Sequence, residues 1–179
     1  EHVCENYSRV ADFFGLTEPK FVFSRQIHTD NIKYCTKSDL HHPLDPLDYE
    51  ADALITDEKF VPLVIQIADC TPILLWDGVK NVVAAVHAGW RSTALDIAGK
   101  TVRAIVRDFG CRAEDIHAAI GPCISQCCYE TGPEVVEGIG KTLGSAVYDC
   151  AEPRGEKFYV DLKGINRAYL NRAGVTRVD

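Results

Sequence analysis

One cysteine and one histidine stand at opposite ends of two short apolar runs. Cys70 comes just before the run 72–76, and His87 comes just after the run 82–86. The residues between the runs, 77–81, include Asp, Gly and Asn and are typical of a hairpin loop. An antiparallel hairpin would bring the thiol and the imidazole to the same edge of a sheet. Such a pair can bind a metal or carry out nucleophilic catalysis.

A second histidine, His28, follows the segment 20–26. Taken alone it is more typical of a surface residue than of a ligand. With Cys70 and His87 it would form a set that binds zinc and leaves a fourth position for water or substrate. A metal-free alternative makes Cys70 a nucleophile and His87 its base, oriented by Asp69.

Copper fits this composition less well than zinc. Copper electron-transfer sites use the same two imidazoles and thiolate, but they usually add a Met ligand, and the chain contains no Met. A multicopper cluster needs many histidines, and the chain has six. The ligand count therefore favours zinc.

The residues after His87 form a candidate anion site. Gly89 leads into a predicted helix, and Arg91 lies near its first turn. Free N–H groups at a helix N-terminus and a guanidinium group both attract phosphate. An arginine that caps the helix or pairs locally explains the sequence equally well.

Charge and cysteine content limit the class of protein. The net charge of −7 argues against a nucleic-acid partner, and no apolar run is long enough to span a membrane. The eight cysteines are expected to be mostly reduced thiols in a cytoplasmic protein. Three of them, Cys123, Cys127 and Cys128, lack the second ligand pair of a structural zinc site, so we expect them to be packing residues.

The remaining chain alternates between short strands and helices. We expect strands over 20–26, 51–56, 61–67, 72–76, 82–86, 116–120, 157–160 and 175–178. We expect helices over 5–14, 133–143 and 162–172, the last after a cap at Asp161. A further helix is expected to begin after a cap at Ser92 or Thr93 and to end at Phe109. The segment 61–67 is apolar throughout and is predicted to be a buried strand, whereas 36–50 is polar and is predicted to be a loop.

Five motifs follow one another in a fixed order. They are Gln26-Ile27-His28, Ala51-Asp52-Ala53-Leu54-Ile55-Thr56, Ala68-Asp69-Cys70-Thr71-Pro72, His87-Ala88-Gly89-Trp90-Arg91, and Gly121-Pro122 with Tyr129-Glu130. Together they closely resemble the YfiH-like family, whose members have been described as multicopper polyphenol oxidase or laccase-domain proteins. The resemblance covers nearly the whole chain.

The resemblance implies a zinc-dependent purine nucleoside phosphorylase, with related deamination of adenosine and cleavage of methylthioadenosine. The family's metal ligands map onto His28, Cys70 and His87, with one zinc per chain. We expect Cys70, His87 and Asp69 to be catalytic, and we expect Gln26, Arg91 and Tyr129 to bind substrate. The family fold, an α+β domain with a mixed sheet flanked by helices, agrees with the order of predicted elements.

The chain departs from the family pattern in two ways. Ser92 stands where members usually carry Gly after the Trp-Arg pair, and its side chain could crowd the anion site or donate to the anion. Members also begin earlier and continue past residue 179. We therefore expect a single YfiH-like catalytic domain over 1–179 that lacks N- and C-terminal flanks.

Three alternative functions stay open: copper-dependent phenol oxidation, a metal-free Cys–His hydrolase, and a zinc-bearing interaction module. For the preferred function the partners are a purine nucleoside and phosphate, with no nucleic acid and no membrane. We expect a monomer or a weak homodimer.

Overall fold

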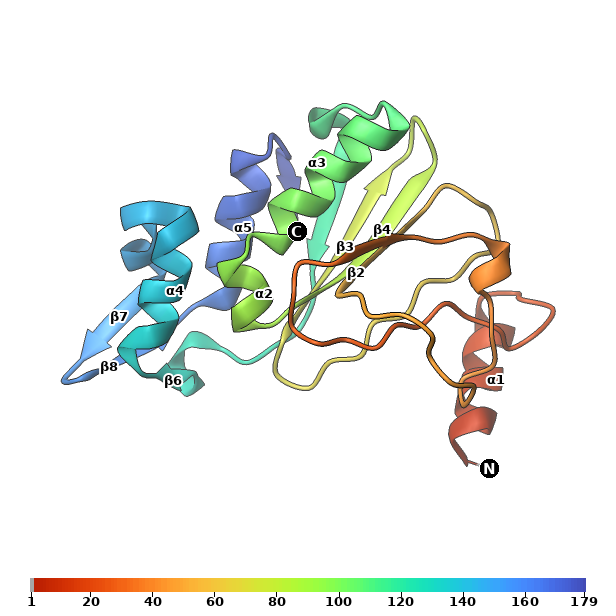
Figure 1. The fold of residues 1–179 in the computed structure, drawn as a ribbon, viewed down its shortest axis with the longest axis horizontal. Coiled ribbons are helices and arrows are strands. Elements are labelled where there is room, and N and C mark those ends of the chain that lie inside the picture. Colours follow the sequence, from red (N-terminus) through yellow and green to blue (C-terminus); the bar gives the residue numbers. More distant parts are fainter. Residues whose placement is uncertain (1) are drawn as a thin grey trace.

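The computed structural model describes residues 2–179. Its centre is a six-stranded mixed sheet in the order β1-β2-β4-β3-β5-β9, and a three-stranded sheet in the order β6-β8-β7 lies at one end (Figure 1). The strands are β1 (Ile32–Tyr34), β2 (Ala53–Thr56), β3 (Thr71–Asp77), β4 (Val82–Ala88), β5 (Ile116–Ile120), β6 (Glu130–Thr131), β7 (Ala151–Arg154), β8 (Lys157–Val160) and β9 (Arg177–Val178). The helices are α1 (His2–Phe13), α2 (Trp90–Ala94), α3 (Ile97–Phe109), α4 (Pro133–Leu143) and α5 (Leu162–Arg172). The predicted α+β class is confirmed.

The β3–β4 hairpin forms the middle of the large sheet, as the sequence predicts. Its strands pair from Thr71 opposite Ala88 to Asp77 opposite Val82. Asp77 stabilises the turn because its Oδ1 accepts hydrogen bonds from the next turn amides, those of Val79 and Lys80, each at 2.8 Å. This register places the start of β3 beside the end of β4, and it determines where the site forms.

The main core lies between the sheet and the helices α3 and α5. Ile97, Val102 and Ile105 of α3 are buried against strand residues such as Ile73 and Val86. Two smaller clusters lie in the N-terminal part of the chain, one around Val22, Cys35 and Leu54 and the other around Ala11, Phe21 and Phe23. The N-terminal segments therefore have apolar packing of their own beside the main core.

The sequence predicts one helix from Ser92 or Thr93 to Phe109, but the structure has two helices, α2 and α3, in this region. Ser92 and Thr93 lie inside α2, so the prediction that one of them caps a helix is wrong. Gly89 precedes α2, and Asp96 begins α3 with a left-handed φ of 59°. The Asp96 carboxylate accepts a hydrogen bond from the Gly99 amide at 3.1 Å, which satisfies one free N–H of the new helix. An Asp can adopt this backbone conformation and cap a helix at once, which explains the break.

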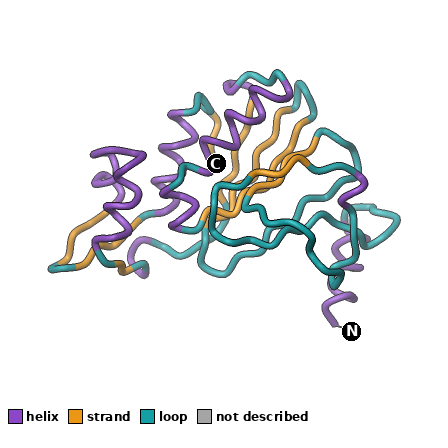
Figure 2. The backbone as a smooth tube through the Cα atoms, in the orientation of Figure 1, coloured by secondary structure: helices purple, strands orange, loops and turns teal. Residues whose placement is uncertain are grey.

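Two predicted strands are absent. The segments 20–26 and 61–67 meet only at a single parallel bridge between Val22 and Leu63. Pro62 has no N–H to continue a ladder, and Ile67 is 40% exposed, so 61–67 is not a strand buried on both faces. Figure 2 shows these segments as loop.

Three short edge strands, β1, β6 and β7, were not predicted. β1 has three residues and β6 has two, and β7 carries Glu152 and Pro153, which are unusual in strands. The predicted strand 175–178 is shortened to β9. Among residues 2–179, no helix has the length and apolar character that crossing a bilayer requires.

Candidate metal centre

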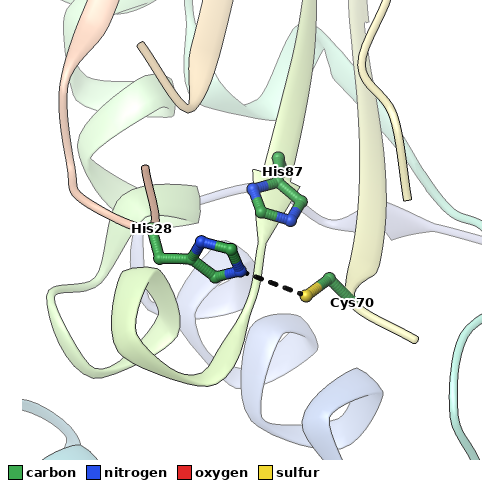
Figure 3. A group of neighbouring side chains, drawn as sticks. All are labelled: His28, Cys70 and His87. Carbon is green, nitrogen blue, oxygen red and sulfur yellow. Dashed lines mark hydrogen bonds between the residues drawn. The ribbon is translucent and has the colours of Figure 1, made fainter. Parts of the chain in front are cut away.

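Three side chains that the sequence singles out converge at one end of the central strands β3 and β4 of the large sheet (Figure 3). His28 lies in the loop before β1, Cys70 directly precedes β3, and His87 is the penultimate residue of β4. One potential ligand atom from each lies within 4.8 Å of the others, and His28 Nε2 is 3.8 Å from Cys70 Sγ. Zinc bonds of about 2.0–2.3 Å place ligand atoms roughly 3.3–3.8 Å apart in a tetrahedron. The His28–Cys70 distance has this spacing, and the group as a whole, at up to 4.8 Å, is about 1 Å wider, so two imidazoles and a thiol could hold zinc after a small closure around the ion.

Gly89 gives this group its space. A Cβ atom added at Gly89 would lie 2.7 Å from His28 Cδ2 and 3.0 Å from Cys70 Sγ. The first distance is shorter than real Cβ contacts and the second is tighter than most, so any side chain here would have to displace His28, and glycine lets the backbone after β4 pass close to both residues. Gly89 therefore leaves room for His28 and Cys70 in the candidate metal centre, and it is also the residue that precedes α2.

Asp52 is a buried acidic residue of the site for which sequence analysis predicted no role. It is 0% exposed, directly precedes β2, and accepts a hydrogen bond from His87 Nδ1–H at 2.8 Å. Burial alone would raise the pKa of Asp52, but hydrogen bonds from His87, Thr29 and His28 outweigh it and lower this pKa. The signal in the sequence was an Asp inside an otherwise apolar segment, because buried carboxylates need partners.

The electrostatics of the free protein favour neutral ligands. Burial is the main reason that the pKa of His87 is lowered, although its contact with Asp52 opposes this. Burial also raises the pKa of Cys70, and the nearby charge of Asp69 adds to the effect. A neutral imidazole is ready to bind a metal, whereas the thiol needs a neighbouring cation to become a thiolate.

Arg91 and Tyr129 lie near the metal centre. The Arg91 guanidinium is exposed and stacks over the Trp90 ring, with its carbon 4.5 Å from the ring centre, and it takes part in no ion pair within residues 2–179. Tyr129 is half-buried, and burial followed by the charge of Cys70 raises its pKa, while Arg91 lowers it. The phenol, the guanidinium and the thiol therefore share one neighbourhood.

The other two predicted site residues have different surroundings. Asp69 is exposed, and its backbone carbonyl accepts a hydrogen bond from the Ile124 amide at 3.1 Å, which joins the loop after β5 to the turn that carries Cys70. Gln26 forms two hydrogen bonds of 2.7 Å with the backbone of Gln66, one through each end of its amide. The Gln26 side chain therefore braces two loops.

The remaining thiols and Ser92 differ from expectation. All eight cysteines are free, but Cys127 and Cys128 are exposed, with sulfur atoms 3.6 Å apart, and so are not packing residues. Ser92 is 0% exposed and has no hydrogen-bond partner within the described part of the chain. Its side chain faces the interior, away from the exposed Arg91.

A comparison with known families and structures identifies the family and the fold. The family model described as multi-copper polyphenol oxidoreductase laccase matches residues 1–179. The chain belongs to this family. The crystal structure of the hypothetical protein YfiH from Bacillus licheniformis is similar to the chain, with a TM-score of 0.93 and 32% identity over 99% of this chain and 70% of that one.

Relatives of this family member carry two enzyme names. A purine nucleoside phosphorylase of Clostridium acetobutylicum is 36% identical over 148 residues, which is 83% of this chain and 58% of the relative. The adenosine deaminase RL5, from an unknown prokaryotic organism, is 36% identical over 90% of this chain and 63% of the relative. The chain therefore spans about three-fifths of the length of these relatives.

Proposed function

We propose that this laccase-family chain is a zinc-dependent purine nucleoside phosphorylase with associated adenosine deaminase activity. The observation that carries this proposal is the His28–Cys70–His87 group with Arg91 and Tyr129 in the same neighbourhood. The names of the relatives agree with both activities. Adenosine, inosine, guanosine and methylthioadenosine are the proposed substrates, together with phosphate.

Phosphorolysis needs an anion held beside the anomeric carbon of ribose, because positive charge develops on the sugar as the base departs. Arg91 is the proposed phosphate ligand, since its guanidinium is exposed and forms no ion pair within residues 2–179. The helix that follows Gly89 has only five residues, so its dipole is small and the proposal depends on Arg91 rather than on the helix N-terminus.

One group of the enzyme must bind the purine base, and another must donate a proton to the base as it leaves. Tyr129 is the proposed contact to the purine, by stacking or by a hydrogen bond, because the charges of both Arg91 and Cys70 act on its half-buried phenol. Asp69 is the proposed acid or base, since it is exposed next to Cys70. In its protonated form the Asp69 carboxyl group would donate its proton to the departing base and be left as the carboxylate.

His28, Cys70 and His87 would hold the zinc. When bound, zinc supplies a Lewis acid and lowers the pKa of water, the chemistry that deamination of adenosine requires. The three residues fix the ligand geometry at the rim of the sheet. Within residues 2–179 this is the one group of three or more clustered His, Cys, Asp and Glu side chains with metal-binding geometry, which favours a single zinc over a copper cluster.

The metal-free hydrolase is less well supported than the zinc enzyme. A nucleophilic cysteine needs a lowered pKa, whereas burial raises the pKa of Cys70. Alkylation distinguishes the two: zinc bound to Cys70 should slow its reaction with iodoacetamide until a chelator is added. If the chelator changes neither alkylation nor turnover, the hydrolase is correct.

The function is tested with protein of measured metal content, incubated with inosine or adenosine in the presence and absence of phosphate. We expect about one zinc per chain, release of base only with phosphate, and release of ammonia from adenosine. His28→Ala should lose zinc and both activities, whereas His42→Ala, a matched change at an exposed histidine in the loop before β2, should retain them. Full activity of His28→Ala, or several coppers per chain, would contradict the proposal.

A further inference from the structure

One buried carboxylate oxygen contacts both histidines of the metal centre. Asp52 Oδ1 accepts hydrogen bonds from His87 Nδ1–H at 2.8 Å and from the backbone N–H of His28 at 3.0 Å. In addition, the backbone N–H of His87 donates to the Asp52 carbonyl at 2.7 Å. Asp52 is therefore joined to one ligand through its ring and to the other through its backbone.

The second oxygen of Asp52 organises the loop that carries His28. Oδ2 accepts hydrogen bonds from the Thr29 amide at 2.7 Å, the Thr29 hydroxyl at 3.0 Å and the Ile27 amide at 3.3 Å. His28 has a left-handed φ of 62°, which is unfavourable for a residue other than glycine. Because three consecutive amides point at one carboxylate, Asp52 holds the loop in this unfavourable conformation.

The contact with His87 also selects the form of its ring. An ionised Asp52 can only accept hydrogen bonds, so the proton of neutral His87 must lie on Nδ1. Nε2 is then left without a proton and can bind a metal. The opposite tautomer would place a hydrogen on Nε2 and prevent this bond.

We propose that Asp52 is the positioning residue for both histidine ligands and sets the metal affinity of the centre. This inference rests on the proposed metal. The variant Asp52→Asn keeps the size of the side chain but replaces one acceptor oxygen with an NH₂ group. In one orientation the NH₂ group faces the amides of Ile27 and Thr29, and in the other it faces His87 Nδ1 and favours the wrong tautomer. Either orientation removes a contact that positions one ligand.

A matched control lies at the other end of the same hairpin. Asp77 is also a buried carboxylate that accepts two backbone N–H groups, but it faces the turn of the hairpin, far along β3 from Cys70. Zinc affinity is measured by competition with a chromophoric chelator for the wild type, Asp52→Asn and Asp77→Asn, together with the unfolding temperature of each metal-free protein. Asp52→Asn should weaken zinc binding by about 10- to 100-fold, and Asp77→Asn by less than about threefold.

The proposal is wrong if Asp52→Asn binds zinc as tightly as Asp77→Asn does while both lose stability, because Asp52 would then be merely structural. A second measurement needs no variant: long-range ¹H–¹⁵N NMR of metal-free wild-type protein reports the tautomer of His87. We expect the Nδ1–H form, and the Nε2–H form would overturn the inference even if Asp52→Asn does not fold. If wild-type protein binds no zinc, the proposed function fails, and the tautomer still decides the role of Asp52.

Discussion

At the scale of single residues, the metal centre depends on the absence of a side chain at Gly89. His28 and Cys70 occupy the space where its side chain would be, at 2.7 Å and 3.0 Å from an added Cβ. Cys70 is held by the start of β3, so the crowding can be relieved mainly by moving His28. A single methyl group at this position should therefore move His28 away from Cys70 while leaving both ligand side chains chemically unchanged.

Gly89→Ala is expected to weaken zinc binding at least about tenfold, because the displaced imidazole can no longer reach the site. The matched control is Gly140→Ala in α4, where an added Cβ would meet Val147 Cγ1 at an ordinary 3.6 Å. That change should leave zinc affinity unaltered and stabilise the helix by about 0.5–1 kcal/mol. Chelator competition and thermal unfolding measure both. Unchanged zinc affinity in Gly89→Ala would show that the ligands adjust to the methyl group.

Arg91→Ala tests the proposed anion contact. Loss of one charged hydrogen-bonding partner should cost about 1.5–3 kcal/mol, which raises the Michaelis constant for phosphate roughly 10- to 100-fold. The constant for the nucleoside should change less. Arg107→Ala, which removes an exposed arginine paired with Asp108 in α3, is the control. If the Michaelis constant for phosphate stays the same in Arg91→Ala, the guanidinium only packs on Trp90.

The sequence was enough to assign a role to some residues of the site and not to others. Cys70 and His87 could be brought together from the hairpin register, whereas His28 lies outside the hairpin and was assigned as a ligand through the family resemblance. Asp52 was not assigned a role because its partners are backbone amides of residues 27–29, which a sequence pattern does not reveal. Gln26 was predicted as a substrate contact, but a sequence cannot show that a distant backbone, that of Gln66, occupies its amide.

At the scale of elements, prediction succeeded where the chain pairs or packs with near neighbours. The β3–β4 hairpin, β5 and α5 follow from local periodicity and turn residues. The segments 20–26 and 61–67 have strand-like sequences, yet they find only single bridges to each other and to the loop 41–50. Whether an apolar run becomes a strand depends on the length of its partner, and here the partners are interrupted by proline and loop residues.

The break between α2 and α3 was missed because apolar spacing continues through it. Asp96 compensates for the break: Oδ1 caps α3 at Gly99, and Oδ2 accepts a hydrogen bond from Arg103 at 2.7 Å. Asp96→Ala should therefore lower the free energy of unfolding by about 1–3 kcal/mol, through loss of the cap and strain at a left-handed residue.

Asp96→Asn is the matched variant, because asparagine tolerates the left-handed conformation and can still cap the helix. It should lose less than half as much stability as Asp96→Ala in urea unfolding followed by circular dichroism. Equal losses in the two variants would mean that the ion pair with Arg103, and not the cap, stabilises the break.

At the scale of the whole molecule, the metal centre joins segments that belong to different apolar clusters. His28 belongs to the N-terminal segments, whose two small apolar clusters are distinct from the main core. Cys70 and His87 belong to the central hairpin of the large sheet. In Figure 1 the N-terminal helix and loops lie at one end and the small sheet with α4 at the other. A metal bound to all three residues would therefore add a connection between the N-terminal segments and the main core, beside the pairing of β1 with β2 and the hydrogen bonds to Asp52.

Zinc should consequently stabilise the native state as a whole. At a free concentration about 100 times its Kd, a ligand that binds only the native protein adds about 2.7 kcal/mol. For a chain of 179 residues this corresponds to a rise in Tm of roughly 5–11 °C. The rise should vanish in His28→Ala and persist in His42→Ala, and zinc should slow hydrogen exchange in residues 24–30 of the wild type. Zinc that raises Tm without protecting this loop would be bound by the hairpin alone, and His28 would then not be a ligand.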